Sequence, residues 1–154
     1  MIKKTIHIIF LIFFLNQCGF DPIYSSKNIN FNINNIETSG NLKTSMALKK
    51  NIENFGNKSS KNKNLNLNIF SNVSKNITSK DKKGNPNTFS LIISVKLGVQ
   101  SDNGELIQKD FSQSSSYSNN SNKFDLKKYE NALTKNLTEK ISKDIILYLQ
   151  DFDI

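Results

Sequence analysis

Two adjacent segments in the second half of the chain alternate apolar and polar residues so regularly that they constrain the fold more than any other feature. Between residues 89 and 99 every odd position is apolar, and most even positions carry a polar residue or glycine. Residues 107–117 follow a weaker version of the same pattern. A period of two places alternate side chains on opposite faces of a sheet, so each segment is predicted to be a strand with one buried face. Asp102-Asn103-Gly104 lies between them and is typical of a hairpin turn.

The length of that turn decides which residues face each other, because a slip of one residue moves every side chain to the other face. A two-residue Asn-Gly turn would set Val99 opposite Gln108 and mix polar groups into the apolar row. A three-residue loop over 102–104, with Gly104 in the left-handed conformation, aligns the apolar rows instead. The pairs that this register predicts are Val99 with Ile107, Val95 with Phe111 and Phe89 with Tyr117.

The rest of the chain predicts two further strands and two helices. Alternating apolar residues indicate strands over 28–37 and 65–77, whereas apolar residues three or four apart indicate amphipathic helices over 42–55 and 125–151. The residues that define these patterns are Ile29, Phe31 and Ile33; Leu65, Leu67, Ile69, Val73 and Ile77; Leu48, Ile52 and Phe55; and Leu126, Tyr129, Leu133, Leu137, Ile141, Ile145 and Tyr148.

Local signals set the expected boundaries of these elements. The first helix should follow a turn over 38–41 and end at Gly56, a residue that favours helix C-termini. The long helix should begin with Asp125 as its cap, with Phe124 and Tyr129 in contact as a hydrophobic staple. A polar loop over 79–87 should join the second and third strands.

The element order predicts one topology. A helix that connects the first two strands makes them parallel, and the two hairpin connections that follow are antiparallel. Because the strands each have one apolar face, both helices should cover that face, and the opposite face, rich in Asn, Ser and Lys, should meet water or a partner. We therefore expect an α+β two-layer sandwich: a four-stranded mixed sheet with two helices on one face, in the order β-α-β-β-β-α.

The first 17 residues are typical of a secretory signal peptide. Lys3 and Lys4 precede the apolar run 5–15, which is too short to span a bilayer and suits a signal h-region. Cys18, the one cysteine of the chain, follows directly, as in the lipobox of bacterial lipoproteins, where the cysteine becomes the acylated N-terminus. We expect residues 1–17 to be removed, residues 18–27 to form an acylated tether and residues 28–154 to form a single domain.

The composition of the mature chain excludes many kinds of chemistry. Removal of 17 residues from 154 leaves 137, lowers the formal charge from +8 to +6 and eliminates His7, the one histidine. Histidine-dependent catalysis, cysteine nucleophiles and Cys/His metal sites are thereby excluded. We expect no metal, no cofactor and no enzyme activity, although carboxylate pairs or a Ser–Lys dyad remain open. All 21 basic residues are lysine, and without arginine we expect no nucleic-acid partner.

The start of the mature chain, Cys18-Gly19-Phe20-Asp21-Pro22-Ile23-Tyr24, resembles that of the LPS-assembly lipoprotein family (LptE type). The element order is similar as well, including a Ser116-Tyr117 pair ahead of the long C-terminal helix. The first helix carries Lys43, Lys49 and Lys50 where relatives are often Arg-rich, so an arginine contact with lipid has no counterpart here.

The resemblance implies an outer-membrane lipoprotein, held by acyl chains at Cys18. It would face the periplasm or lie in the lumen of its partner, a β-barrel that translocates lipopolysaccharide (LPS). It would help this barrel to assemble and to deliver LPS to the outer leaflet. Candidate contacts with LPS phosphates are Lys80, Lys82 and Lys83, which cluster in the loop 79–87, although an ordinary solvated loop would look the same.

Two other classes of function remain open from the sequence. One is a lipid-anchored periplasmic binding or auxiliary subunit of another envelope transporter. The other is a lipid-anchored hydrolase that uses carboxylates. Absence of a barrel on co-purification would favour the subunit of another transporter over the function that the resemblance implies. A defined small substrate would reveal a hydrolase.

Overall fold

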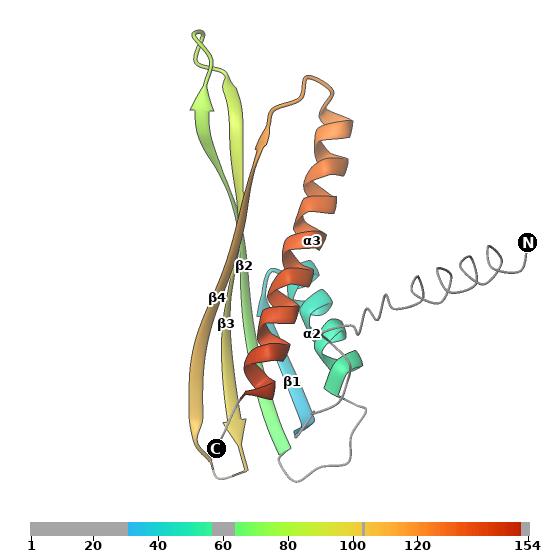
Figure 1. The fold of residues 1–154 in the computed structure, drawn as a ribbon. Helices are drawn as coiled ribbons and strands as arrows, with labels where there is room; N and C mark the ends of the chain where they lie inside the picture. Colours follow the sequence, from blue (N-terminus) through green and yellow to red (C-terminus); the bar gives the residue numbers. More distant parts are fainter. Residues whose placement is uncertain (1–30, 57–63, 103, 152–154) are drawn as a thin grey trace, which may run out of the picture.

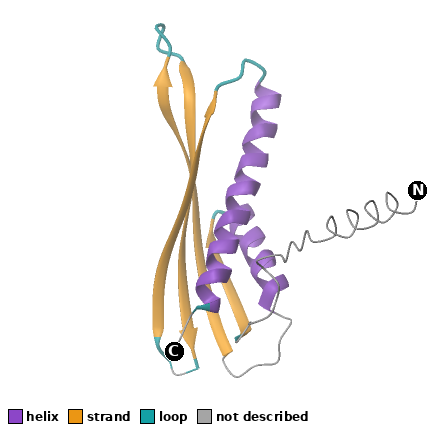
Figure 2. Cartoon of the chain, viewed as in Figure 1, coloured by secondary structure: helices purple, strands orange, loops and turns teal. Residues whose placement is uncertain are grey.

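The computed structural model describes residues 31–56, 64–102 and 104–151, and these form one α+β unit (Figures 1 and 2). One four-stranded sheet is covered on one face by two helices, in the predicted order β-α-β-β-β-α. The elements are β1 (Asn32–Gly40), α2 (Leu42–Gly56), β2 (Asn64–Lys80), β3 (Pro86–Ser101), β4 (Leu106–Ser118) and α3 (Lys123–Gln150). The expected fold class is confirmed.

The sheet has its strands in chain order, and their directions match the prediction. β1 pairs with β2 in parallel, with α2 as the crossover between them, and β2–β3 and β3–β4 are antiparallel. The register of the last hairpin is the predicted one, with Val99 opposite Ile107 and Phe89 opposite Tyr117. Gly104 has a φ of +82°, the left-handed conformation that the three-residue loop requires.

The core lies between the apolar face of the sheet and the two helices. α2 packs on β1 and β2, α3 packs on β3 and β4, and the helices also pack on each other (Figure 1). The inward row of β3 is buried throughout, from Phe89 to Val99. It meets Ile141 and Ile145 of α3 and Leu48 and Ile52 of α2 within one apolar cluster. The last turns of α3 bury Ile145, Ile146 and Leu149, in agreement with their apolar surroundings in the sequence.

Helix α3 begins earlier than predicted, and its expected cap is wrong. The cap is Asn122, whose side-chain oxygen accepts hydrogen bonds from the backbone N–H groups of Phe124 (3.1 Å) and Asp125 (3.3 Å). These are among the helix N–H groups that lack an intrahelical acceptor, so an upstream asparagine extends the helix. The predicted hydrophobic staple between Phe124 and Tyr129 is wrong too. Phe124 is 77% exposed, and the ring centre of Tyr129 lies 5.7 Å from that of Tyr117 instead.

The first strand differs from the simple alternation. The pairing of β1 with β2 shifts between Ile33 and Asn35, which is the mark of a bulge. As a result Phe31 and Ile36 are the buried residues, while Ile33 is partly buried, and the strand continues through the predicted turn to Gly40. Ile29 lies outside the described residues.

β2 and β3 are longer than expected and form a hairpin that projects past the end of β1 (Figure 1). β1 reaches only to Ser71 of β2, and the strands continue to Lys80 and from Pro86. The predicted loop 79–87 is thus reduced to residues 81–85. Ile77 was predicted to face the core but is 50% exposed, because it lies on β2 beyond the end of β1 at Ser71, whereas α3 packs on β3 and β4.

Candidate functional site

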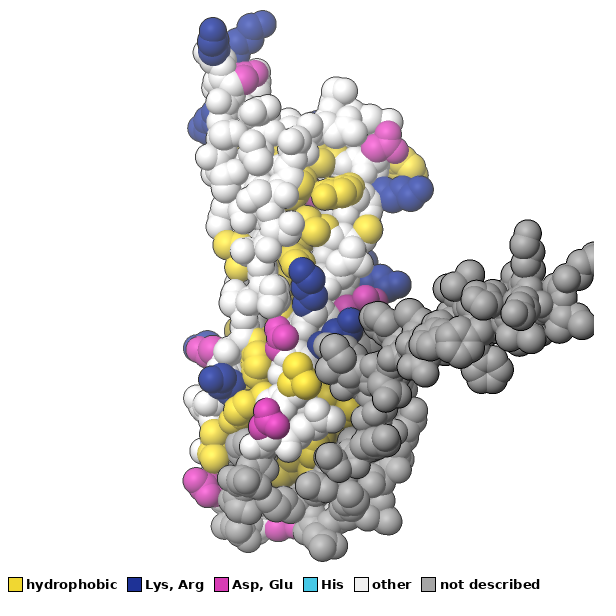
Figure 3. Space-filling view, viewed as in Figure 1, with side chains coloured by type: hydrophobic (Ala, Val, Ile, Leu, Met, Phe, Trp, Pro, Cys, Tyr) yellow, Lys and Arg dark blue, Asp and Glu magenta, His cyan; other side chains and the backbone are white. Residues whose placement is uncertain are grey.

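The three candidate lysines lie together at the tip of the projecting hairpin, as the sequence predicts. Lys80 ends β2, Lys82 and Lys83 lie in the turn, and all three are exposed. Figure 3 shows these lysine side chains gathered at the free end of the molecule. Cys18, the predicted lipid-attachment residue, lies outside the described residues.

The turn at the tip is ordered by one carboxylate. The side chain of Asp81 accepts hydrogen bonds from the backbone N–H groups of Lys83 (2.8 Å) and Asn85 (2.9 Å) and from the side-chain amide of Asn85 (3.0 Å). The hydrogen bonds from Asn85, led by that of its side chain, hold the pKa of Asp81 below its ordinary value. Gly84 at φ +83° completes the turn. Three lysines and one ionised aspartate give the tip a formal charge of +2.

Below the tip, a polar group that sequence reasoning missed links the hairpin to α3. Glu130 of α3 accepts hydrogen bonds from Lys75 of β2 (2.5 Å) and from the hydroxyl of Tyr117 of β4 (2.7 Å). The ammonium group of Lys75 also lies 3.9 Å from the centre of the Phe89 ring, a cation–π contact. Phe89 and Tyr117 pack at 5.6 Å between ring centres. Side chains from three strands and one helix therefore form one connected group, in which Glu130 accepts hydrogen bonds from two of the strands.

The protonation of this group follows from its surroundings. Burial alone would raise the pKa of Glu130, but the hydrogen bonds from Lys75 and Tyr117 outweigh it, so the pKa lies below its ordinary value. Burial raises the pKa of Tyr117, and the neighbouring carboxylate raises it further. At neutral pH Glu130 is ionised and Tyr117 keeps its proton, so the group is an ion pair with a neutral donor and not a proton-transfer pair.

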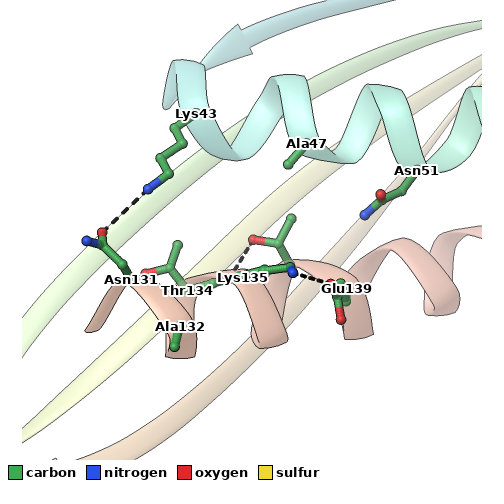
Figure 4. Close-up of a pocket in the computed structure, with 9 residues that line it drawn as sticks. Lys43, Ala47, Asn51, Asn131, Ala132, Thr134, Lys135 and Glu139 are labelled. Carbon is green, nitrogen blue, oxygen red and sulfur yellow. Dashed lines mark hydrogen bonds and ion pairs between the residues drawn. The ribbon is translucent and has the colours of Figure 1, made fainter. Parts of the chain in front are cut away.

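A pocket of about 410 Å³ lies between α2 and α3 (Figure 4). Its walls come from short side chains, among them Ala47, Ala132 and Thr138, which leave space between the helices. Polar side chains span the rim, with Lys43 donating to Asn131 (3.4 Å) and Lys135 lying 3.9 Å from Glu139. The single carboxylate of the lining, Glu139, is thus already paired with a lysine. The geometry suits an apolar side chain or a short length of acyl chain better than hydrolytic chemistry.

The uncovered face of the sheet has a shallow hollow of about 480 Å³. It lies over Gly98, where the missing side chain leaves space between Asn68 and Leu106. Two large apolar side chains border it, Phe70 at 47% exposure and Leu106 at 53%. The sequence predicted this face to be polar. At the hollow, with its apolar borders, the face differs from that prediction.

The described residues hold neither a metal-binding cluster nor a helix able to span a membrane. In residues 31–56, 64–102 and 104–151, no cluster of three or more His, Cys, Asp or Glu side chains is placed to hold a metal ion. No helix within these ranges is long and apolar enough to cross a membrane.

The fold defined by these elements is also found among solved structures of small α+β proteins. No protein-family model matches the sequence, and the comparison with curated proteins finds no relative. Among solved structures, the chain is similar to rare lipoprotein B from Shewanella oneidensis, with a TM-score of 0.61, 13% identity and coverage of 77% of this chain and 95% of that one.

Two further structures show the same likeness. A minor lipoprotein from Acinetobacter baumannii has a TM-score of 0.61 and 12% identity, with 80% of this chain and 93% of that chain covered. Lipoprotein B from Nitrosomonas europaea has a TM-score of 0.58 and 14% identity, with 81% and 83% covered. The likeness covers between 83% and 95% of these three chains, so it extends over most of each solved structure.

Proposed function

We propose that this protein is an outer-membrane lipoprotein that assists the assembly of an LPS-translocating β-barrel and the delivery of LPS to the outer leaflet. The observation that carries the proposal is the shared fold with rare lipoprotein B and the minor lipoprotein, together with a signal-like start that ends at Cys18. In this proposal the protein is not an enzyme, and its partners are the barrel, LPS and the membrane that holds its acyl chains.

The geometry of the described residues supports a binding role with two separate surfaces. The hairpin tip presents Lys80, Lys82 and Lys83 away from the core, where ammonium groups can reach phosphates as point charges. The open sheet face offers Phe70 and Leu106 around a hollow, as a surface that packs against a wall does. We assign the tip to LPS and the open face to the barrel.

Processing at Cys18 is the first test of the proposal. Mass spectrometry of the protein from its own membranes should find an acylated Cys18 as the first residue, and Cys18→Ala should leave an uncleaved or mislocalised precursor. A mature chain that still begins at Met1 without acyl groups would refute the lipoprotein assignment. Two acyl chains or more make anchoring stable, since each buried CH₂ contributes about 0.8 kcal/mol.

The second test distinguishes the proposed function from that of an auxiliary subunit of another transporter. Depletion of the protein should lower the amounts of folded barrel and of surface LPS, and the purified protein should carry the barrel with it. If no barrel co-purifies and surface LPS is unchanged on depletion, the auxiliary subunit is favoured instead.

Replacing Lys80, Lys82 and Lys83 together by Glu should weaken binding to LPS several-fold while co-purification with the barrel is largely retained. The reason is that the tip charges would meet phosphate, whereas a barrel contact is spread over a larger area. The matched control replaces Lys50, Lys128 and Lys140, also exposed, by Glu, which gives the same change in net charge away from the tip. If both triple variants lose LPS to the same extent, net charge and not the tip governs binding.

A further inference from the structure

The outer edge of β4 offers a row of backbone groups that no other strand among the described residues uses. β4 is the last strand of the described sheet, and β3 is its one partner there. The backbone N–H of Asn119 donates to Asn87 (2.8 Å) and that of Ser101 donates to Glu105 (3.3 Å), and both pairs continue the β3–β4 register. Bonded pairs in an antiparallel ladder fall on every second residue. The odd residues of β4 therefore bond to β3, and the even ones, from Leu106 to Ser118, direct their N–H and C=O groups outward.

Open strand edges usually carry features that prevent pairing with another chain, such as bulges, lysines or proline. The edge of β1 has a bulge between Ile33 and Asn35. The part of β2 that β1 leaves open carries Lys75 and Lys80 and two register shifts near Ser79. Among the edges that the structure describes, β4 differs, because its 13 residues pair with β3 without a shift and contain no proline.

The charges on β4 are confined to one end of the strand. Lys109 and Asp110 are its charged residues, and the following stretch 111–118 is uncharged, with four serines on the exposed side: Ser112, Ser114, Ser116 and Ser118. The charges close to that stretch belong to α3, where Asp144 accepts a hydrogen bond from Gln113 (3.0 Å) and Glu130 accepts one from Tyr117 (2.7 Å). Uncharged edge strands without bulges are the type that accepts a further strand.

We propose that the β4 edge pairs with the β4 edge of a second copy of this chain, antiparallel, about a two-fold axis at Ser114. Phe111 and Tyr117 lie three residues on either side of Ser114 within the uncharged stretch, so this register sets each of them opposite the other in the second copy. Even residues oppose even residues, as the outward backbone groups require. The contact is isologous and closes on itself as a dimer. It does not rest on the proposed function.

Two cross-strand pairs support this register, one on each face. On the helix-covered face Phe111 lies opposite Tyr117 of the second copy, an aromatic cross-strand pair of the kind that stabilises sheets. On the open face Asp110 lies opposite a serine, Ser118 of the second copy, so no like charges oppose each other. Phe111 is partly buried in the single chain, against Tyr148 at 5.9 Å between ring centres, and the added strand would cover it further.

Thiol cross-linking tests the register in the full chain, extracted from membranes in mild detergent. In the paired dimer the two Ser114 Cα atoms lie about 5.5 Å apart. The two Ser118 residues are separated by eight positions along the strand, or about 27 Å. With a short bismaleimide, Ser114→Cys should give a covalent dimer and Ser118→Cys should not. Both variants retain Cys18, so any product through that residue appears equally in both.

Proline substitution tests the backbone groups themselves. Ser114→Pro removes an outward N–H without removing a bond to β3, whereas Ser114→Ala keeps it. Sedimentation should show a several-fold smaller dimer fraction for the proline variant than for the alanine variant, with circular dichroism to verify folding. A monomer at all concentrations, or equal cross-linking of Ser114→Cys and Ser118→Cys, would overturn the proposal, and the cross-linking arm decides it even where the proline variant does not fold.

Discussion

A Gly40→Ala variant is expected to lose about 3–5 kcal/mol of folding free energy, because two separate costs add at this residue. Gly40 has a φ of +87°, a conformation that alanine adopts only with strain. A Cβ atom there would lie 2.0 Å from the carbonyl oxygen of Ser71, which is backbone of the adjacent strand and has no room to move aside.

The surroundings of Gly40 explain why the clash is not relieved by a local shift. The same carbonyl of Ser71 accepts the backbone N–H of Asn41 at 2.8 Å, where β1 turns into α2. The buried hydroxyl of Ser71 lies 2.7 Å from that of Ser45, which in turn donates to the carbonyl of Ser39. Moving the strand away would break these hydrogen bonds within the core.

Chemical denaturation of Gly40→Ala beside Gly104→Ala measures the effect. Gly104 has a similar φ of +82°, but nothing lies within 4 Å of a Cβ atom added there. Gly104→Ala therefore measures the backbone strain alone, and its expected loss of folding free energy is about 1–2 kcal/mol. Equal losses for the two variants would mean that the β1–α2 connection opens freely and that the close approach to Ser71 carries no energy.

The second large effect is expected at Glu130. Glu130→Gln should cost about 1–3 kcal/mol, because it removes the charged acceptor of both Lys75 and Tyr117 in a place where the Glu130 side chain is 15% exposed. Glu139→Gln is the matched control on the same helix: its pair with Lys135 is 3.9 Å long and its side chain is 48% exposed, so a loss near zero is expected. Thermal unfolding of both variants at neutral pH makes the comparison.

The same carboxylate predicts a dependence of stability on pH. The pKa of Glu130 is lower in the folded protein than its ordinary value of 4.5, which it regains on unfolding. Its contribution is therefore complete above about that value and is lost as the pH falls through the folded pKa. Wild type should lose more stability between pH 5 and pH 3 than Glu130→Gln does. Parallel stability curves for the two proteins would show that Glu130 contributes nothing through its charge.

Much of the fold could be predicted because the patterns that set it are local. The alternation of β3, matched to the weaker alternation of β4, predicts both the register and the left-handed conformation of Gly104, and both are confirmed. The cap of α3 was missed because asparagine and aspartate are equally good caps, and Asn122 and Asp125 are both spaced to begin the same helix. The bulge in β1 shifts the buried row by one residue, and no residue type in NINNIE marks it.

The site was predictable only where it consists of neighbours in the chain. Lys80, Lys82 and Lys83 form a cluster in the sequence and also in space. Glu130, the carboxylate that links Lys75 to Tyr117, lies 55 residues after Lys75 in the chain. The angle at which α3 crosses the sheet determines which side chains it contacts. The pocket between α2 and α3 likewise depends on short side chains from two distant helices. Neither has a signature in a single sequence.

The half-covered hairpin gives the molecule two regions of different local stability. From Asn64 to Ser71, β2 has a strand on each side and a helix layer above it, so amide hydrogen exchange there should require global unfolding. Beyond Ser71 one edge of β2 is open, and Ile77 is already half exposed. Amides toward Lys80 should therefore exchange through local opening, orders of magnitude faster. The charged tip can then sample a range of orientations around a rigid base and adjust to a ligand at no cost to the core.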